Sequence, residues 1–181
     1  TGLANRALLE DRLQQALARA RRNRQSIALL LIDLDKFKEI NDTHGHEHGD
    51  AMLVAVAGRL RATVRDCDTV ARLGGDEFVL LLGEVHDAGD CDIVAAKLLS
   101  AIVEPVHFRD VELRCSVSIG AAIFPANGHD ATTLFRQADE AMYAAKRAGR
   151  AAYRRAPAES PESAVSLEGQ VTESTGLNSQ S

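Results

Sequence analysis

Two adjacent carboxylates, Asp76 and Glu77, interrupt an otherwise apolar stretch that spans residues 70–84. Gly74 and Gly75 stand just before them, where they permit a tight two-residue turn and a close approach of a ligand to the main chain. A buried carboxylate without a partner is costly or becomes protonated. The pair therefore indicates a cation bound at the turn, although Gly-Gly-Asp is also typical of an ordinary exposed turn.

A further carboxylate, Asp33, follows the apolar stretch of residues 27–32. Lys36 and Lys38 come next, in a segment expected to be a short turn with free main-chain N–H groups that could hold phosphate oxygens. If the hairpin pairs beside this strand, Asp33 and Asp76 become neighbours. Two carboxylates from adjacent strands suit Mg²⁺, which usually completes its shell with water and substrate phosphates. The sequence therefore predicts a site for a metal-bound triphosphate.

Periodic apolar residues define the elements that must position these groups. Helical spacing predicts helices over residues 5–22, 50–64, 92–103 and 130–149, the last with Asp130 as N-cap and Gly149 as C-cap. Residues 27–32 are predicted to form a strand covered on both faces, residues 69–82 a hairpin, and the alternating residues 111–120 a strand with two distinct faces. This order predicts an α+β fold, with helices packed on a mostly antiparallel sheet.

The 181-residue chain has the composition of a globular protein, with 45% hydrophobic and 26% charged residues. Residues 1–155 suffice for one domain, whereas residues 156–181 are rich in Ser, Glu, Gln, Pro and Gly and are predicted to be a disordered tail or linker. The longest apolar run, residues 27–32, is too short to span a bilayer, and no secretory leader opens the sequence. We therefore expect a cytoplasmic domain, and anchoring of a longer protein to a membrane stays open.

Charge and cysteine content narrow the class of protein further. Residues 1–155 carry all 21 basic and 22 of the 26 acidic residues, so their net charge is −1 against −5 for the chain. A near-neutral domain lacks the basic surface that polymeric nucleic acid requires, whereas a small phosphate-bearing ligand needs only a local cluster. Cys67, Cys91 and Cys115 are odd in number and widely spaced, which argues against a disulfide framework and a structural zinc site.

Four motifs resemble those of the GGDEF-domain diguanylate cyclases in their residues, their order and their spacing. The resemblance covers nearly all of residues 1–152. The motifs are Thr1-Gly-Leu-x-Asn-Arg6, then Asp33-x-Asp-x-Phe-Lys-x-Ile-Asn-Asp42 with Gly45-His46-x-x-Gly49-Asp50, then Gly74-Gly75-Asp76-Glu77-Phe78, and finally Ala138-Asp-x-x-x-Tyr143-x-Ala-Lys146-x-x-Gly-Arg150. One departure is Ala151, where the family usually has Asn. The resemblance implies a five-stranded, mostly antiparallel sheet surrounded by helices, similar to nucleotidyl cyclases and the polymerase palm.

The activity implied by the resemblance is the condensation of two GTP into cyclic di-GMP and two pyrophosphates. In each step a ribose 3′-hydroxyl attacks an α-phosphorus. By the same analogy, Asp33, the Leu34 carbonyl, Asp76 and Glu77 would hold two Mg²⁺ or Mn²⁺ ions, and Lys38 would stabilise charge on the phosphates. Asp76 is also the family's candidate for the general base, a role that conflicts with tight metal binding.

The same motifs imply residues that bind the nucleotide. Lys146 and Arg150 would reach the triphosphate, unless they merely complement the helix dipole, and Arg72 is a weaker candidate for a phosphate contact. Asn41 and Asp50 match the family's guanine-binding residues. A carboxylate can accept the N1–H and 2-amino protons of guanine, and adenine offers neither.

Three alternating histidines, His44, His46 and His48, lie in a Gly-containing segment that is predicted to be a loop. With Glu47 and Asp50 close by they raise zinc as an alternative metal, but no fourth ligand at metal-site spacing is apparent. His46 alone falls on a family motif and is predicted to line the guanine pocket.

Arg65 and Asp68 resemble the family's R-x-x-D site, where product binds and inhibits the enzyme. A guanidinium and a carboxylate can hold guanine or phosphate.

Because one domain would hold one GTP and the product needs two, the resemblance implies a catalytic homodimer with two-fold symmetry. The chain opens on Thr1 rather than Met, so we expect a fragment with a regulatory domain upstream. The rival hypotheses are a non-catalytic module that binds GTP or cyclic di-GMP, and a cyclase that uses another nucleotide.

Overall fold

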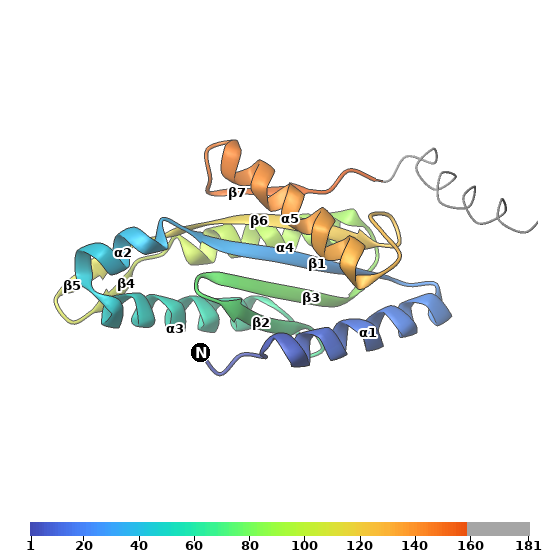
Figure 1. The fold of residues 1–181 in the computed structure, drawn as a ribbon, viewed down its shortest axis with the longest axis horizontal. Helices are drawn as coiled ribbons and strands as arrows, with labels where there is room; N and C mark the ends of the chain where they lie inside the picture. The colour runs from blue at the N-terminus through green and yellow to red at the C-terminus, as the bar shows by residue number, and fades with distance from the viewer. Residues whose placement is uncertain (159–181) are drawn as a thin grey trace, which may run out of the picture.

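The computed structural model describes residues 1–158, whose elements are labelled in Figure 1. Residues 159–181, which hold most of the predicted tail, lie outside the described residues. The helices are α1 (Arg6–Asn23), α2 (Phe37–His44), α3 (His46–Thr63), α4 (Ala88–Ile102) and α5 (Ala131–Arg147). The strands are β1 (Ser26–Asp35), β2 (Thr69–Gly74), β3 (Glu77–Val85), β4 (Val106–Phe108), β5 (Val111–Leu113), β6 (Ser116–Phe124) and β7 (Ala152–Arg155).

A five-stranded sheet in the order β2-β3-β1-β6-β7 forms the centre of the domain. β1 pairs antiparallel with β3 on one side and with β6 on the other, and β7 adds one parallel strand at the edge. β4 and β5 pair with each other in a separate two-stranded sheet. The predicted α+β fold with a mostly antiparallel, five-stranded sheet is therefore confirmed.

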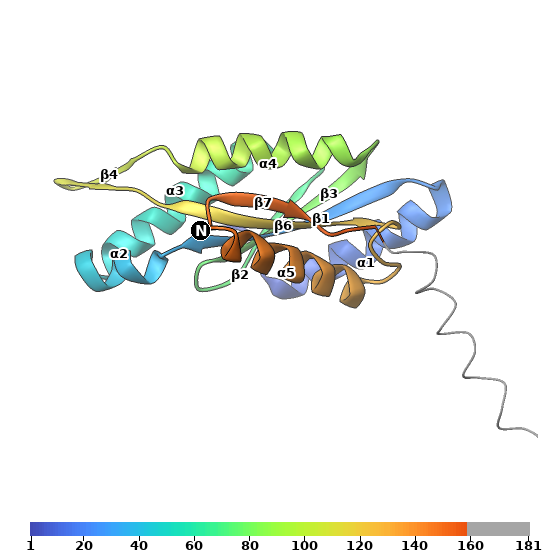
Figure 2. The same cartoon turned by 90° about the horizontal axis from the view of Figure 1, so that it is seen from above.

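Helices cover both faces of the sheet (Figure 2). α1 and α5 pack on one face, and α3 and α4 pack on the other. β1 is buried on both faces because its alternate side chains enter two cores: Leu30 and Ile32 face α3 and α4, whereas Leu29 and Leu31 face α1 and α5. Asp33 continues the second series, so its side chain emerges on the α5 face of the sheet.

The segment after β1, expected to be a turn, is the helix α2. Lys36 precedes it in the left-handed conformation, with φ 61°, and the buried ring of Phe37 anchors its first turn. α3 begins at His46 rather than at the expected residue 50, because Gly45 both ends α2 and begins α3. His44 therefore ends one helix, and the other two histidines begin the next.

The strand expected over residues 111–120 is two strands, β5 and β6, in different sheets. β5 pairs with β4, whereas β6 pairs with β1 and β7. Leu113, Cys115 and Val117 are nevertheless all buried, since the chain passes from one sheet to the other without breaking the alternation. Alternation alone does not reveal where a strand changes its partner.

The ends of α5 largely follow the expected caps. The Asp130 side chain accepts a hydrogen bond from the Thr133 amide at 2.9 Å, which confirms the N-cap. At the other end the C-cap is Ala148, and Gly149 follows it with φ 118°. The expected C-cap at Gly149 is thus one residue too late.

Gly120 of β6 allows α5 to pack directly on the sheet. A Cβ atom at this position would lie 2.1 Å from the Ala138 carbonyl oxygen and 2.1 Å from the Met142 nitrogen. Both contacts are with the main chain of α5, which cannot move aside as a side chain can. The absence of a side chain at Gly120 therefore fixes the distance between α5 and the strands beneath it.

β7, which the sequence patterns did not predict, continues into a packed segment. Ala156 is 4% exposed, and its amide donates a hydrogen bond of 2.8 Å to the Ala121 carbonyl. The Asn127 side chain donates to the carbonyls of Ala156 and Pro157 at 3.3 and 2.6 Å. The main chain is thus held by hydrogen bonds through residue 157, and the domain boundary after residue 155 stays a prediction.

Candidate active site

The end of β1 and the turn of the β2–β3 hairpin meet at one edge of the sheet. Asp33 pairs in register with Glu77, and the Leu34 amide donates a hydrogen bond of 3.2 Å to the Asp76 carbonyl. The Asp76 charge is close enough to contribute to the raised pKa of Asp33. Asp33 and Asp76 are partly buried, and Glu77 is exposed. The structure therefore brings together the four residues that were predicted to hold the metal.

Gly75 and Asp76 form the turn of the hairpin, because Gly74 still pairs with Glu77. The turn expected at Gly74 and Gly75 is therefore displaced by one residue. Gly75 adopts φ 51°, a value that favours glycine. Arg72 donates to its carbonyl oxygen from Nε at 3.0 Å and from Nη2 at 2.6 Å. Arg72, predicted as a phosphate contact, thus fixes the turn that presents Asp76.

Lys146 of α5 forms an ion pair with Asp33, with 2.8 Å between Nζ and Oδ2. The two side chains are 29% and 13% exposed, so this pair is more shielded from water than most surface pairs. Burial raises the pKa of Asp33 despite this partner, and the charges of Asp76 and Asp35 act in the same direction. Asp33 is therefore a carboxylate whose surroundings favour additional positive charge.

Asp35 is a buried carboxylate to which the sequence analysis assigned no role. It is 5% exposed and accepts hydrogen bonds from the Ser116 and Ser118 hydroxyls, both at 2.7 Å, and from the Ala151 amide at 3.0 Å. Arg150 Nε lies 4.0 Å from its Oδ1. Asp35 thus joins β1, β6 and the segment after α5. Its spacing of two from the preceding aspartate, which puts both on one face of β1, is the signal that could have identified it.

α2 and α3 hold the residues predicted to bind guanine. Gly49 lets the two helices approach, since a Cβ there would lie 2.0 Å from Asn41 Oδ1 and 3.1 Å from the Phe37 ring. Asp50 is the residue of α3 that follows Gly49, so it is adjacent in sequence to the residue that lies against Asn41. Asn41 is partly buried, and Asp50 and His46 are exposed. These polar groups are therefore accessible to a ligand.

The cations predicted to bind the triphosphate come from two elements that both reach the end of β1. Lys38 is exposed in the first turn of α2, which follows β1 after a single residue. Lys146 lies in the last turn of α5, and Arg150 lies just beyond it. The ion pairs with Asp33 and Asp35 hold this end of α5 against β1. Positive charge is thus available beside the carboxylates.

Arg65 and Asp68 lie in the loop that joins α3 to β2, at the end of the hairpin opposite its turn. The Asp68 carboxylate accepts hydrogen bonds from the Arg65 amide at 3.1 Å and from the Gly83 amide at 3.0 Å. Both residues line a cavity of about 280 Å³, together with Glu84 and Lys97. The structure therefore places the predicted inhibitory pair apart from Asp33 and Asp76.

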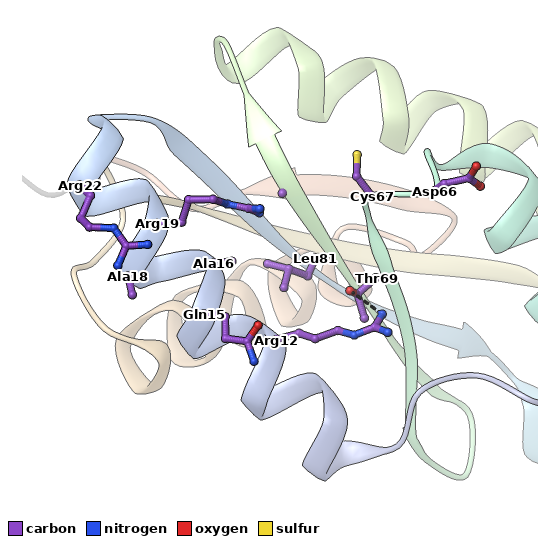
Figure 3. A pocket seen from close by; sticks show the side chains of 11 residues that line it. Arg12, Gln15, Ala16, Ala18, Arg19, Arg22, Asp66, Cys67, Thr69 and Leu81 are labelled. Atoms are coloured by element: carbon purple, nitrogen blue, oxygen red, sulfur yellow. Dashed lines mark hydrogen bonds between the residues drawn. The ribbon is translucent and has the colours of Figure 1, made fainter.

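A larger groove, of about 540 Å³, lies between α1 and the β2–β3 pair (Figure 3). Arg12, Arg19 and Arg22 extend from α1 along it, and Arg12 donates a hydrogen bond of 3.1 Å to the Thr69 hydroxyl. Cys67 stands on the opposite wall and is exposed. This groove contains none of the residues predicted to bind metal or substrate, so it is separate from the candidate active site.

The histidines at the junction of α2 and α3 do not form a metal centre. The His48 ring meets the Phe108 ring edge-on, with centroids 5.1 Å apart, and lies 5.7 Å from the His44 ring. Within residues 1–158, neither these histidines nor the carboxylates of Asp33, Asp76 and Glu77 form a group of three or more side chains that could hold a metal by themselves. The structure therefore gives no support to the zinc alternative.

The carboxylates at Asp33 and Asp76 fit an ion that brings further ligands with it. Two carboxylates and a main-chain carbonyl do not complete an octahedral shell, but Mg²⁺ is commonly bound by one or two carboxylates plus water and substrate phosphates. The ammonium of Lys146 already lies at hydrogen-bonding distance from Asp33, which shows that a cation is accommodated at this carboxylate. The donor set thus suits a divalent ion that arrives with a polyphosphate.

Comparison with known families decides to which of them the chain belongs. Residues 1–152 match the family described as diguanylate cyclase, GGDEF domain. The chain belongs to the GGDEF family. This GGDEF domain is 48% identical over 153 residues to MucR, a bifunctional diguanylate cyclase/cyclic di-GMP phosphodiesterase of Pseudomonas aeruginosa. It is 41% identical over 162 residues to TpbB, a diguanylate cyclase of the same organism.

These relatives are considerably longer than the chain. The alignment with MucR covers 84% of this chain but only 22% of MucR, and the alignment with TpbB covers 89% of this chain but only 37% of TpbB. The chain thus spans less than half the length of either protein. Within residues 1–158, none of the helices has the combination of length and apolar composition needed to cross a membrane.

Solved structures show the same architecture. The crystal structure of the TpbB GGDEF domain from Pseudomonas aeruginosa superposes with a TM-score of 0.85 at 41% identity, covering 87% of this chain and 99% of that one. The GGDEF domain of DgcB from Caulobacter crescentus, solved in complex with c-di-GMP, gives a TM-score of 0.75 at 32% identity and covers 86% and 90%. The fold expected from the resemblance is confirmed.

Proposed function

We propose that this GGDEF domain is a diguanylate cyclase, which condenses two GTP molecules into cyclic di-GMP and two pyrophosphates. The observation that carries the proposal is the convergence of Asp33, Asp76 and Lys146 at the end of β1. It places carboxylates for a metal and a cation for phosphates in one site. The named cyclase TpbB, at 41% identity, supports the same activity.

In this proposal Asp33, the Leu34 carbonyl, Asp76 and Glu77 hold two Mg²⁺ or Mn²⁺ ions. Such ions, when bound, lower the pKa of the attacking hydroxyl and neutralise charge on the leaving pyrophosphate. The chain contributes the fixed geometry. Pairing of β1 with β3 sets Asp33 opposite Glu77, and the hydrogen bonds from Arg72 fix the turn that carries Asp76.

Lys38, Lys146 and Arg150 are the proposed triphosphate ligands, with Arg72 beside the turn as a fourth cation. Their task is to orient the triphosphate so that its α-phosphorus faces the 3′-oxygen of the second GTP. Each step forms a bond from that oxygen to phosphorus and breaks the bond from phosphorus to the bridging oxygen, so pyrophosphate leaves with the electron pair. The hydroxyl proton passes to Asp76 or to water.

Asn41 and Asp50 are the proposed guanine contacts, with His46 lining the same pocket. An adenine there would leave polar groups of the site without partners, at a cost of about 1–3 kcal/mol for each buried one. The expected preference is therefore for GTP over ATP. Asp50→Ala should reduce this preference, measured as the ratio of product formed from the two nucleotides, and an unchanged ratio would exclude Asp50 as a guanine contact.

Product inhibition is proposed at Arg65 and Asp68. Their cavity is separate from the carboxylate site and is lined by the cations Arg65 and Lys97 and by the carboxylates of Asp68, Glu84 and Asp90. In this proposal the cations hold the phosphates of the product, and the Asp68 carboxylate accepts from its guanine N–H groups. The DgcB structure in complex with c-di-GMP shows that a relative at 32% identity binds this molecule. In Arg65→Ala, product should accumulate beyond the level at which the parent protein stops.

The experiment that tests the proposed activity is incubation of the purified protein with GTP and Mg²⁺, followed by identification of the product by mass. Cyclic di-GMP and pyrophosphate in a ratio of one to two are expected, and Asp76→Asn should abolish both. Repeating the reaction with ATP and with mixtures identifies any other cyclic dinucleotide. GTP that stays intact at high protein concentration would overturn the proposal.

A non-catalytic nucleotide-binding module is the second candidate. The relative NbdA of Pseudomonas aeruginosa, 35% identical over 150 residues, is named a cyclic di-GMP phosphodiesterase, so domains of this family occur in proteins named for other activities. The presence of both Asp33 and Asp76 favours the cyclase, because binding without turnover does not require both metal-binding carboxylates. Binding of GTP without turnover in the assay above would favour the module.

A further inference from the structure

Lys146 stands where the metal site and the phosphate site overlap. Its ammonium lies 2.8 Å from Asp33 Oδ2, and this oxygen belongs to one of the carboxylates proposed to hold the metal. A Mg²⁺ ion binds a carboxylate oxygen at about 2.0–2.1 Å. Two cations this close to one oxygen would repel each other strongly, since the side chains are 13% and 29% exposed and water screens them little.

The position of Lys146 is set by the packing of α5 rather than by the ion pair alone. The main chain of Met142, one turn before Lys146, rests on Gly120 of β6. Beyond Lys146, the Ala151 amide is held by the buried Asp35. Both ends of the segment that carries Lys146 are therefore fixed, and only its flexible side chain has freedom to move.

We propose that Lys146 is a built-in counter-ion, which neutralises Asp33 while the site holds no nucleotide and moves to the triphosphate when a metal–nucleotide complex enters. This inference rests on the proposed function and goes beyond it, because it assigns Lys146 a second partner and an order of events. Lys146 opposes the binding of metal alone. It favours the binding of metal and triphosphate together, since the phosphates then receive the ammonium that Asp33 releases.

The consequence is a site that discriminates between a free divalent ion and an ion bound to GTP. The affinity for the metal without nucleotide should be weak, and the affinity in the presence of nucleotide should be strong. Replacing Lys146 by an uncharged side chain should have opposite effects on these two affinities. A lysine that only braces α5 against β1 would instead weaken both of them, or neither.

The test measures binding of Mn²⁺ by electron paramagnetic resonance, first without nucleotide and then with a GTP analogue that cannot be cleaved between its α- and β-phosphates. Lys146→Met should tighten nucleotide-free Mn²⁺ binding about tenfold, within the usual range of coupling between ligands. It should weaken binding of the Mn²⁺–analogue complex by a similar factor. Asp33→Asn, which removes the proposed ligand, should abolish Mn²⁺ binding in the absence of nucleotide.

Arg147→Met is the matched control. It removes one positive charge from the same last turn of α5, but Arg147 is exposed and is not one of the proposed phosphate ligands. Its effect on both Mn²⁺ affinities should stay within twofold. If Lys146→Met unfolds the domain, as judged by circular dichroism, Lys146→Gln keeps a polar side chain of similar length and serves in its place.

The proposal is overturned if removing the Lys146 charge leaves nucleotide-free Mn²⁺ binding unchanged or weaker. It is also overturned if neither Lys146→Met nor Lys146→Gln binds Mn²⁺ without nucleotide. The proposed function fails independently of these results. Opposite shifts in the two Mn²⁺ affinities, in a domain that makes no cyclic di-GMP, would support the counter-ion and refute the cyclase. Synthesis of cyclic di-GMP without the opposite shifts would do the reverse.

Discussion

Asp33 and Asp35 lie on the same face of β1 but have different surroundings. Three hydrogen-bond donors lie within 3.0 Å of the Asp35 carboxylate, which is buried. Asp33 is more exposed, is paired with the flexible Lys146, and faces the charge of Asp76. A carboxylate whose lone pairs are already used by the protein cannot readily bind a ligand. We therefore expect Asp35 to be a positioning residue and Asp33 to be the carboxylate that is available to a metal.

Asp35→Asn tests this positioning role. The amide would offer one oxygen where the carboxylate offers two, so at least one donor among Ser116, Ser118 and Ala151 would lose its partner. A lost charged hydrogen bond in the interior costs about 1.5–3 kcal/mol, and the free energy of unfolding in urea should fall by this amount. The segment that carries Arg150 should loosen, which would raise KM for GTP more than it lowers kcat.

Ser116→Ala is the control for that variant, because it removes one donor and leaves Asp35 charged with two others. Its loss of stability should be smaller, about 1 kcal/mol. An Asp35→Asn protein that is as stable as the parent and has the same KM would contradict the positioning role.

At the scale of the elements, the contact of α5 with β6 sets the position of Lys146 relative to Asp33. α5 carries Lys146, and its distance from the sheet depends on Gly120, whose missing side chain admits the helix main chain. Asp33 lies on the adjacent strand β1, opposite Ser118 of β6. A small displacement of α5 would therefore separate the ammonium from the carboxylate while leaving the rest of the sheet intact.

Gly120→Ala should displace α5. The new Cβ would lie 2.1 Å from two main-chain atoms of the helix, so the helix must shift, at a cost of about 1–3 kcal/mol in the free energy of unfolding. Turnover of GTP should fall further than stability, because the cations at the end of α5 move with it. Gly58→Ala is the matched control: Gly58 lies in α3 with nothing within 4 Å of its Cβ position, and alanine there should stabilise by about 0.4–1 kcal/mol.

The elements also show which features local sequence can predict. The strand at residues 27–32, the hairpin and the Asp130 cap depend on neighbouring residues, and the structure confirms them. β7 was missed because a four-residue edge strand has too little pattern, and it forms only where β6 offers a parallel partner. The change of sheet between β5 and β6 was missed because the alternation continues across it.

At the candidate site, too, some features can be predicted from local sequence and others depend on distant residues. The motifs predicted which residues belong to the candidate metal and nucleotide sites. The pairing of the hairpin beside the strand that ends at Asp33 was a condition of the prediction, and the structure meets it. The contact between Lys146 and Asp33 joins residues that are 113 positions apart in the sequence, and the burial of Asp35 depends on β6 and on the segment after α5. Such contacts follow from the packing of the whole domain, which no short pattern contains.

At the scale of the whole molecule, the three cysteines should report on global unfolding. Cys67 is exposed in the arginine-lined groove (Figure 3), whereas Cys91 and Cys115 are buried in the core. Burial raises the pKa of Cys91 to about 12 and that of Cys115 to about 11, so neither supplies reactive thiolate at pH 8. One thiol per chain should react rapidly with Ellman's reagent, and all three should react in denaturant. Rapid reaction of a second thiol in the native protein would contradict the described core.

The proposed reaction places a demand on the whole molecule that a single domain does not meet. Its product contains two guanosine units, and the described residues hold one set of guanine and triphosphate candidates, so we expect two copies to face each other in a catalytic dimer. If the isolated domains associate weakly, the dimer concentration rises as the square of the protein concentration, and the rate per milligram should rise linearly with protein until the dimer dominates. The measurement is initial pyrophosphate release at saturating GTP across a hundredfold range of protein concentration.

Adding an excess of Asp76→Asn protein should lower the rate of the parent, because mixed dimers carry one defective site. A rate per milligram that is independent of concentration, together with a monomeric mass in sedimentation at the same concentrations, would contradict the dimer and would require both nucleotides to bind to one domain.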